Sequence, residues 1–539
     1  MSYTTIEFFL FVGITLLAYF IFPAKKYKWT VLLVASYVFY LFAGYKYAFF
    51  IVFTTLSTYG VALWIDKIIK KSKEVIKEKK KEWSREEKKA YKNKIKIKKR
   101  LVMSLVLVIN FGILAFLKYY NFFAGSLNDL LGFTDNGGLP IFSLVLPLGI
   151  SFYTFQSMGY IVDVYREKVS AERNVAKFAL FVSFFPQIIQ GPISFYDQLA
   201  HQLYEPHKFD FTRFKYGLEL ILWGYFKKLV IADRAVIAIN TVTADYTQYN
   251  GTTILFIVLL YALQLYADFS AGIDISRGIA QILGIDMVEN FKRPYFSKNI
   301  NEYWRRWHIT LGAWMKNYLF YPVAMSNLFI TASKKMKGTK FGKTSAGAHI
   351  AKVLPTSVAS LIVFLMVGIW HGANWKYVGF GLWNGLIIMI SILLEPVFKA
   401  TLKKLHINGE SFGYGIFQMV RTFVVVLVGY VFDIAPDFSG AIDMMRMSLF
   451  DQHIMEGYRE ILTLGVSKIE YLLLALCTVL IFVVSVIQER HSNECMRDIL
   501  DRRSAVVRIG LITLCIVAIL VFGIYGPGYN PAEFVYMQF

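Results

Sequence analysis

Apolar runs as long as a bilayer is thick recur along the whole chain. Of its 539 residues, 56% are hydrophobic and 18% are charged, which is more apolar surface than one soluble core can hide. A helix needs about 20 apolar residues to cross the hydrocarbon core. The sequence therefore predicts an all-α, polytopic membrane protein with roughly 11 to 13 membrane elements, some of them tilted or broken. The runs cover residues 6–22, 29–45, 47–65, 101–117, 141–164, 176–191, 216–231, 253–285, 353–370, 377–394, 415–432, 469–487 and 507–525.

The first apolar run and the three cysteines further narrow the class of membrane protein. No basic residue precedes residues 6–22 and no small-residue cleavage site follows them, so we expect a retained helix rather than a signal peptide. Cys477 and Cys515 lie in apolar runs and Cys495 lies in a charged loop, which does not fit a disulfide framework. The sequence contains no Cys and His cluster with metal-ligand spacing, no Gly-rich phosphate loop and no internal repeat, so we expect no metal site.

The net charge of +21 is distributed unevenly. Residues 67–100 hold 17 Lys or Arg against five Glu, and two further basic loops lie within 334–352 and 399–404. The positive-inside rule places such loops in the cytoplasm. Residues 119–140 and 433–467 are neutral or acidic and are expected outside. Threading the apolar runs between these loops predicts that both termini are extracytoplasmic.

Residues 67–100 are rich in helix formers and are expected to form a solvated helical hairpin. Two interpretations of its charge stay open. The hairpin could anchor the chain at anionic lipid headgroups, or it could dock an acidic carrier protein or the phosphates of CoA. Nucleic-acid binding is not expected, because no recognition motif accompanies the charge.

A histidine interrupts the apolar pattern between two predicted spans, in the segment 370–375 that reads Trp-His-Gly-Ala-Asn-Trp. Ionisable residues at such positions commonly face a protein interior or a water-filled cavity and mark function. Neutral imidazole can accept a proton at physiological pH, so His371 is a candidate general base. The same residue could equally be a hydrogen-bonded structural group, with Gly372 allowing close approach of a substrate or of another backbone.

A second polar cluster lies at residues 301–315, where three tryptophans accompany a histidine and an arginine pair. On a helix, Trp304 and His308 share one face, while Arg305 and Arg306 turn toward another. The segment could contribute to a site. It could also be an amphipathic helix held at the headgroup level by its aromatic and basic residues.

A third polar cluster lies at 266–274, where Asp268 and Asp274 interrupt an apolar helix. Broken helices line cavities in membrane proteins. Asp268 could orient a histidine and fix its tautomer, or it could pair with Arg277 or Lys292 to neutralise a buried charge. Proline and glycine also break the runs near residues 147–149 and 186–192, and these breaks are expected to shape a cavity rather than to react.

Together, the motifs resemble the bacterial branch of the membrane-bound O-acyltransferase (MBOAT) family. That branch includes alginate O-acetyltransferases, the peptidoglycan O-acetylating membrane subunit and the D-alanyl transferase of teichoic acids. The resemblance is carried by residues 304–315, by Tyr-Leu-Phe-Tyr-Pro at 318–322 and by residues 370–375. The Phe-Pro-Gln and Gly-Pro pairs within 185–192 and the Asp268 segment also look like the polysaccharide-acetylating members.

The resemblance implies roles for particular residues. His371 matches the active-site histidine of the family, and His308 matches its second, less universal histidine. Asp268, Asn374, Trp370, Trp304, Arg305 and Arg306 are then expected to line the substrate tunnel or to orient substrates. The family fold implies a ring of helices around a thin floor, pierced by a tunnel between a cytoplasmic donor and an outer acceptor.

The chain ends in an aromatic tail, Phe-Val-Tyr-Met-Gln-Phe at 534–539. An exposed apolar terminus is expected to dock somewhere, and similar tails occur in the polysaccharide-acetylating relatives. The phenolic oxygen of Tyr536 could receive an acyl group and pass it on; simple C-terminal packing is the alternative.

The function that these features predict is transfer of an acetyl group from a cytoplasmic thioester, acetyl-CoA or a carrier-protein thioester, toward hydroxyls of an extracytoplasmic polysaccharide. Relatives also imply a separate extracytoplasmic partner, an acetyltransferase of the SGNH (Ser-His-Asp) type. D-alanylation of teichoic acids is the alternative within the family, and a proton-coupled transporter or flippase is the alternative from another class. The expected segments are N-terminal helices at 1–66, the Lys-rich hairpin at 67–100, a catalytic core at 101–395, C-terminal helices at 396–526 and the tail at 527–539.

Overall fold

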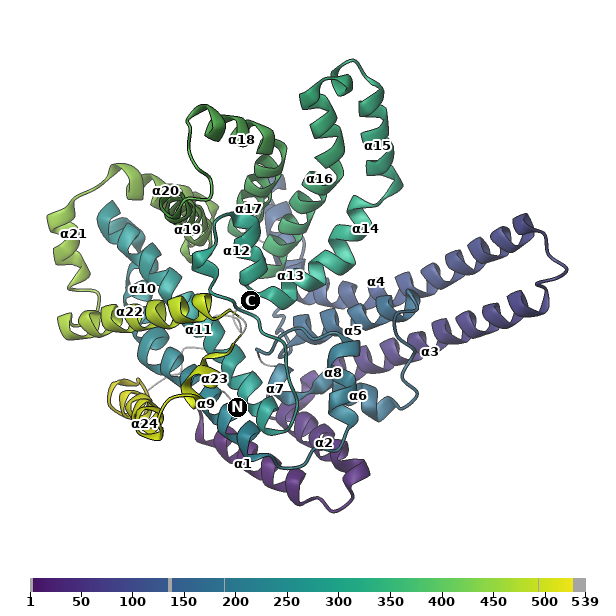
Figure 1. Ribbon diagram of the computed structural model, residues 1–539, viewed down its shortest axis with the longest axis horizontal. Coiled ribbons are helices and arrows are strands. Elements are labelled where there is room, and N and C mark those ends of the chain that lie inside the picture. Colours follow the sequence, from purple (N-terminus) through teal and green to yellow (C-terminus); the bar gives the residue numbers. More distant parts are fainter. Residues whose placement is uncertain (1–2, 134–137, 189, 493, 527–539) are drawn as a thin grey trace. The chain divides into compact units, whose positions relative to one another are not determined.

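The computed structural model describes residues 3–133, 138–188, 190–492 and 494–526, and every regular element in these ranges is helical (Figure 1). The chain divides into two compact units, which are described separately. Unit 1 comprises residues 1–218 and 276–288, and unit 2 comprises 219–275 and 289–539. The all-α fold class predicted from the apolar runs is confirmed.

Eight helices are long and apolar enough to cross a membrane, within the part of the chain that the structure describes. Two shorter apolar helices, Ile6–Ile21 and Val175–Ile188, accompany them. The chain is a multi-pass membrane protein. The expected run at 141–164 is divided, because Gly149 has φ 66° and the helix starts only at Ile150. The eight helices span Tyr45–Glu78, Arg85–Leu131, Gly251–Ile282, Ser345–His371, Trp375–Leu393, Phe412–Ile434, Lys468–Arg490 and Ala505–Phe522.

Unit 1 contains the first eight α-helices of the chain, and its last segment, 276–288, includes the end of α11. The helices are α1 Ile6–Ile21, α2 Lys28–Leu41, α3 Ala48–Glu78, α4 Arg85–Leu131, α5 Ile150–Tyr165, α6 Val175–Ser183, α7 Phe185–Ile188 and α8 Tyr196–Tyr204. Two helices run across the unit boundary in sequence, α9 Phe211–Tyr225 and α11 Gly251–Ile282.

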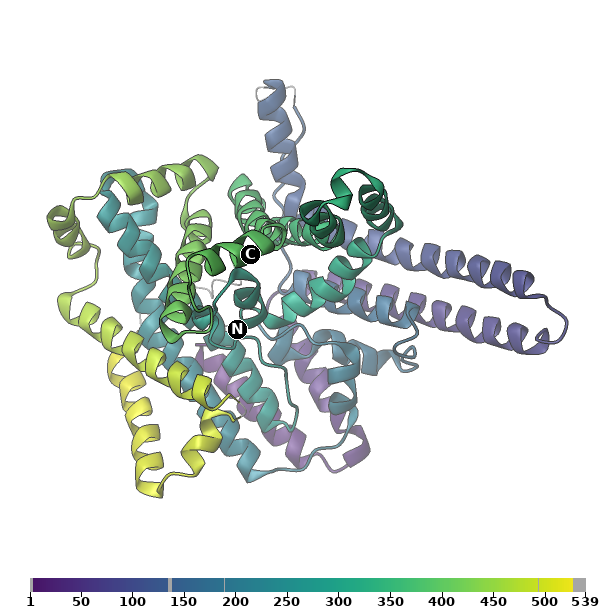
Figure 2. The same ribbon diagram turned by 45° about the horizontal axis from the view of Figure 1, so that its top comes forward.

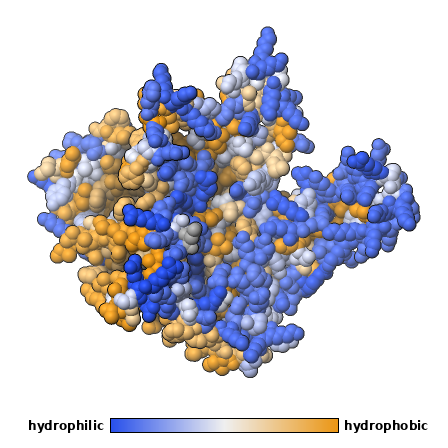
Figure 3. All heavy atoms as spheres, in the orientation of Figure 1, coloured by the Kyte–Doolittle hydropathy of each residue, from blue (hydrophilic) through white to orange (hydrophobic). Residues whose placement is uncertain are grey.

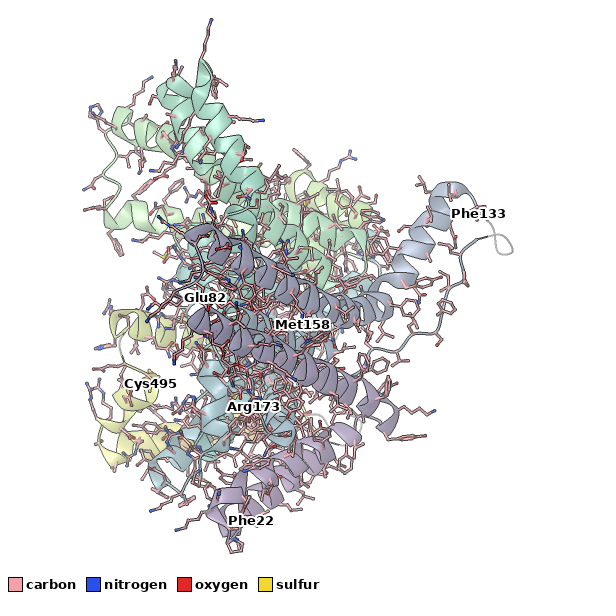
Figure 4. The ribbon with its side chains drawn as sticks, turned by 90° about the vertical axis from the view of Figure 1, so that its right-hand side faces the viewer. Phe22, Glu82, Phe133, Met158, Arg173 and Cys495 are labelled. Carbon is pink, nitrogen blue, oxygen red and sulfur yellow. The ribbon has the colours of Figure 1, made fainter. Side chains whose placement is uncertain are left out.

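Helices α3 and α4 form a long antiparallel hairpin whose turn lies in the Lys-rich segment (Figures 1 and 2). Ser84 and Glu87 form a reciprocal capping box at the start of α4, which satisfies two backbone donors that the helix itself leaves open. Figure 4 labels Glu82 in this turn and Phe133 beyond the other end of α4. Hydrophilic side chains cover the projecting end of the hairpin (Figure 3).

The base of the hairpin is tied to the loop that follows α5. Glu167 forms ion pairs of 2.9 Å with both Lys73 on α3 and Lys99 on α4. Asp66 on α3 likewise pairs with Arg173. These contacts fix where the two helices leave the rest of unit 1.

Unit 2 contains the remaining helices and two short π-helical turns. They are η3 Phe226–Ala232, α10 Asp233–Ala244, α12 Ile300–Arg306, α13 Ile309–Met315, η6 Lys316–Phe320, α14 Tyr321–Ala324, α15 Asn327–Gly338, α16 Ser345–His371, α17 Trp375–Leu393, α18 Glu395–Lys404, α19 Phe412–Ile434, α20 Phe438–Phe450, α21 Ile454–Ile461, α22 Lys468–Arg490, α23 Met496–Asp501 and α24 Ala505–Phe522. Short 3-10 turns also connect helices within each of the two units.

Glycines allow α16 and α17 to pack backbone against backbone. A Cβ atom on Gly368 would lie 2.2 Å from the Tyr377 carbonyl oxygen, and one on Gly381 would lie 2.5 Å from the Phe364 carbonyl oxygen. Any larger residue at these positions would push the helices apart, because real Cβ atoms do not approach so closely. The close pairing fixes the position of His371, which is the last residue of α16.

Candidate functional site

A pocket in unit 2 brings both candidate histidines together. Apolar and aromatic side chains form most of its wall. This is the composition typical of a substrate pocket, in which a few polar groups fix the orientation of the ligand. The pocket is lined by Leu265, Phe269, Trp304, Trp307, His308, Leu311, Trp370, His371, Phe380, Tyr430 and Asp433.

His371 enters this pocket from the C-terminal end of α16. Its ring packs on Phe380 of α17, with 4.8 Å between the ring centroids. Its Nδ1 atom lies 3.9 Å from Oδ1 of Asp433 in the last turn of α19. The adjacent Gly372 has a fully extended backbone, and a Cβ atom there would lie 2.2 Å from the Tyr377 ring. The small residue is therefore needed for the packing beside the histidine.

His308 lies between α12 and α13 with a positive φ of 45°, a backbone conformation that is uncommon outside glycine. It is buried, and its ring meets the Phe269 ring edge to face at 4.9 Å. Asn290 Oδ1 accepts hydrogen bonds of 2.9 Å from both the amide and the hydroxyl of Thr310. The Asn290 amide group is then left to donate to His308 Nδ1, at 3.1 Å. This arrangement favours the tautomer in which His308 Nε2 carries the proton.

Burial, with a smaller contribution from the charge of His371, lowers the pKa of His308 to about 3. The ring is therefore neutral at physiological pH. In this state it can donate a hydrogen bond through Nε2 without carrying a charge.

This lowered pKa predicts how stability depends on pH. A histidine in the unfolded chain has a pKa of about 6.5 and binds a proton below that pH, whereas His308 in the folded protein resists protonation. The stability it contributes is complete above pH ~6.5 and is lost as pH falls, by up to about 1.4 kcal/mol per pH unit. In thermal unfolding of the detergent-solubilised protein, His308→Asn is expected to flatten the decline between pH 6.5 and pH 5. An unchanged decline would contradict the burial of His308.

The candidate tryptophans also line the pocket. Trp304 donates from Nε1 to the Asn384 side-chain oxygen at 3.1 Å, and Asn384 in turn donates to the Phe380 carbonyl at 3.0 Å. Trp370 lies beside both histidines, with ring centroids 6.0 Å from His308 and 5.4 Å from His371. The indole rings therefore form the wall on which both imidazoles rest.

The candidate arginines and Asn374 are not among the pocket-lining residues. Arg306 pairs with Glu302 at 2.7 Å and with Glu489 of α22 at 3.0 Å, while Arg305 is exposed. Asn374 caps α17 by accepting from the Lys376 amide at 3.0 Å. The structure thus gives Arg306 and Asn374 contacts within the protein that need no substrate.

Asp268 lies in a buried ionic cluster next to the pocket wall. Lys228 Nζ contacts Asp268 at 2.7 Å and Asp233 at 2.9 Å, and Lys227 contacts Asp274 at 2.8 Å. Both lysines belong to the π-helical turn η3, and such turns frequently accompany functional sites. Sequence reasoning considered Arg277 and Lys292 as partners of Asp268 and missed Lys228. The cluster holds α11, whose Leu265 and Phe269 line the pocket.

Two further pocket residues, Tyr430 and Asp433, were missed by sequence reasoning. The Tyr430 hydroxyl lies 2.7 Å from that of Tyr303 and 3.2 Å from that of Tyr295, which donates to the Ala262 carbonyl at 2.6 Å. Asp433 counted only as part of an acidic outer loop. The available signal was a carboxylate directly after an apolar run that ends at residue 432. Tyr536 lies outside the described residues.

Comparison with known proteins shows which family the chain is similar to. The model of the MBOAT, membrane-bound O-acyltransferase family, matches residues 167–337, which include His308. A probable alginate O-acetylase of Pseudomonas syringae is 30% identical over 427 residues, covering 78% of this chain and 70% of that protein. A peptidoglycan O-acetyltransferase of Helicobacter pylori is 29% identical over 82% of this chain and 78% of its own length.

A teichoic acid D-alanyltransferase of Bacillus subtilis is 26% identical over 46% of this chain and 60% of its own length. Its similarity therefore covers less of the chain than that of the O-acetylases. The alginate O-acetylase aligns over most of both chains, and the resemblance inferred from the motifs is confirmed. The chain belongs to the MBOAT family of membrane-bound O-acyltransferases.

Proposed function

We propose that this enzyme transfers an acetyl group from a cytoplasmic thioester toward hydroxyls of an extracytoplasmic polysaccharide. The observation that carries the proposal is the pocket in which His371 and His308 lie among aromatic side chains. A base and a neutral hydrogen-bond donor in one apolar pocket suit acyl transfer, because few waters compete there for the thioester. The names of two relatives, alginate O-acetylase and peptidoglycan O-acetyltransferase, support acetyl as the acyl group.

The two histidines take different parts in the proposed reaction. His371 removes the proton from the incoming hydroxyl as its oxygen bonds to the thioester carbonyl carbon. The carbon–sulfur bond then breaks, and the departing thiolate takes this proton from the imidazolium. His308 donates through Nε2 toward the developing oxyanion, where a neutral donor in a dry site is most effective. Trp304 and Trp370 exclude water from both rings.

The donor is acetyl-CoA or an acetylated carrier protein, approaching from the cytoplasm. The positive-inside rule places the basic loops on that side, and their charge favours a donor with phosphates or acidic residues. Exposed Arg305 is the candidate for such a contact among the residues of the second motif.

The acceptor is a polysaccharide of the cell wall or of the secreted matrix. Alginate and peptidoglycan are the polymers named for two relatives. An extracytoplasmic transferase of the SGNH type would complete the transfer if the membrane protein acetylates only an intermediate carrier. The aromatic tail offers such a carrier, since the phenolic oxygen of Tyr536 could hold an acetyl ester.

The test is acetyl transfer by the purified full-length protein in liposomes, with labelled acetyl-CoA and, separately, a labelled acetyl carrier protein. Transfer of label by the wild type, lost in His371→Ala, is the expected result. Label transferred from a D-alanyl donor but from neither acetyl donor would replace the proposal by teichoic acid D-alanylation.

The role of the tail is tested with Tyr536→Phe in the same assay. If the tyrosine oxygen is an acyl relay, stable label on the wild-type chain is expected to disappear in this variant, because phenylalanine lacks the accepting hydroxyl. Mass spectrometry of the C-terminal peptide locates the label. Tyr525→Phe, another tyrosine near the C-terminus, is the matched control. Undiminished label on the Tyr536→Phe chain would contradict the relay.

A further inference from the structure

We propose that Asp433 is the carboxylate that positions His371, and that Lys376 holds Asp433 in place. The inference rests on the proposed acyl transfer and adds two positioning residues to it. His371, Asp433 and Lys376 come from three different helices, α16, α19 and α17. Their arrangement gives His371 a defined tautomer and supplies a counter-charge at the moment when the ring becomes protonated.

The side chains of His371 and Asp433 lie close together. Nδ1 of His371 and Oδ1 of Asp433 are 3.9 Å apart, and their side chains are 15% and 3% exposed. This separation exceeds a hydrogen bond by about 1 Å. Catalytic hydrogen bonds often tighten only when substrate is bound, and a small rotation of either side chain would close the gap.

Lys376 fixes the helix turn that carries the Asp433 carboxylate. Lys376 Nζ donates to the backbone carbonyl of Asp433 at 2.9 Å and to that of Ala435 at 2.6 Å. The last carbonyls of a helix have no partner within the helix, so the ammonium group both caps α19 and fixes its final turn. Lys376 lies only five residues after His371. One short segment thus carries the histidine and also holds the residue that would orient it.

Titratable groups from several helices surround His371. The groups around His371 are Asp433 and Tyr430 from α19, Tyr377 from α17, and His308 before α13. Lys376 of α17 interacts electrostatically with Asp433. Among these groups, Asp433 is the only carboxyl group. A buried carboxylate needs a nearby cation, and Lys376 supplies one through its contact with the same helix turn.

The chemistry follows from which ring nitrogen faces the acid. With the Nδ1 proton directed at Asp433, the Nε2 lone pair can accept the proton of the acceptor hydroxyl. Nε2 takes the hydroxyl proton while the oxygen bonds to the thioester carbon. The carbon–sulfur bond then breaks, and Nε2 passes the proton to the departing thiolate. The Asp433 carboxylate faces Nδ1 and stabilises the imidazolium. Without it, the ring could adopt the other tautomer, which presents a proton instead of a lone pair.

The deciding variant is Asp433→Asn, which keeps the shape of the side chain and removes its charge. We expect kcat to fall about 10²-fold, less than in His371→Gln, with little change in the KM for the donor. The acid limb of the pH–rate profile should also move to lower pH, because the imidazolium loses its counter-charge. Asp437→Asn is the matched control: Asp437 caps α20 through the Gly440 amide, asparagine caps equally well, and wild-type kinetics are expected.

Lys376→Met tests the second positioning residue. It should lower kcat less than Asp433→Asn does, and Lys376→Arg should restore most of the loss because arginine can also donate to both carbonyls. A double variant, His371→Gln with Asp433→Asn, should be no slower than His371→Gln alone, since the two residues act as a unit.

The outcomes separate this inference from the proposed function. A wild-type enzyme that transfers no acetyl group overturns the proposed function. An active wild type whose Asp433→Asn variant keeps its kcat and pH profile overturns only the positioning role. Loss of folded protein with an unchanged rate per folded molecule, measured by size-exclusion chromatography, would assign Asp433 a structural role and also contradict the inference.

Discussion

Replacing His371 by glutamine is expected to lower the rate of acetyl transfer by about 10³-fold, the largest effect of any single substitution on activity. Glutamine keeps a polar side chain at the end of α16 but cannot accept a proton at neutral pH. The stacking on Phe380 and the close packing of α16 on α17 should persist, so the protein should remain folded. The measurement is label transfer from the thioester donor under single-turnover conditions.

A matched control for this variant lies on the same helix. His349 of α16 contacts the Ile392 carbonyl through Nε2 at 3.1 Å and is not among the pocket-lining residues. His349→Gln can keep that hydrogen bond and is expected to retain activity. Equal losses in both variants would show that the effect comes from α16 as a whole, whereas transfer that survives in His371→Gln would remove His371 from the mechanism.

Replacing Lys228 by methionine is expected to destabilise the protein by about 3–5 kcal/mol, the largest effect on folding. Lys228 is buried between Asp268 and Asp233, and methionine would leave these carboxylates in a dry site without that cation. Because Phe269 and Leu265 lie on the same helix as Asp268 and line the pocket, activity should fall with stability. The change in stability is measured by thermal unfolding of the detergent-solubilised protein and by the yield of folded protein.

An exposed ion pair provides the contrast. Lys79 contacts Glu82 at 3.2 Å, with side chains 48% and 68% exposed, so Lys79→Met should cost less than about 1 kcal/mol. Adding Asp268→Asn to Lys228→Met should recover part of the lost stability, because it removes a carboxylate charge that had lost its partner. An unfolding temperature that Lys228→Met leaves unchanged would show that the buried cluster is not needed for the fold.

Several features could be predicted from the sequence because they depend on local composition. Apolar length alone predicts the long spans such as α16 and α22, and the Lys-rich stretch predicts a polar helical segment. The segment 370–375 showed His371 as the polar residue between two spans. These inferences need no knowledge of which helices pack together.

The partners of the site residues could not be predicted, because they are set by packing between distant segments. Asp433 is 62 residues from His371 in sequence, and only the approach of α19 to α17 brings it to the histidine. The sequence suggested Arg306 as a substrate contact, but in the structure this residue pairs with Glu489 of α22. The partner of Asp268 is likewise Lys228 in the π-helical turn, and no pattern in the sequence indicates the geometry of that turn.

The central claim is acetylation of an extracytoplasmic polysaccharide, and its most direct test is the ester content of that polysaccharide in cells. Acetyl and D-alanyl esters on purified cell-surface and secreted polymers would be measured by NMR in cells that lack the protein. The same cells would then be complemented with wild type or with His371→Gln. We predict that acetyl esters are lost without the protein, return with the wild type alone, and that D-alanyl esters stay constant. Unchanged acetyl esters with a loss of D-alanyl esters would contradict the account.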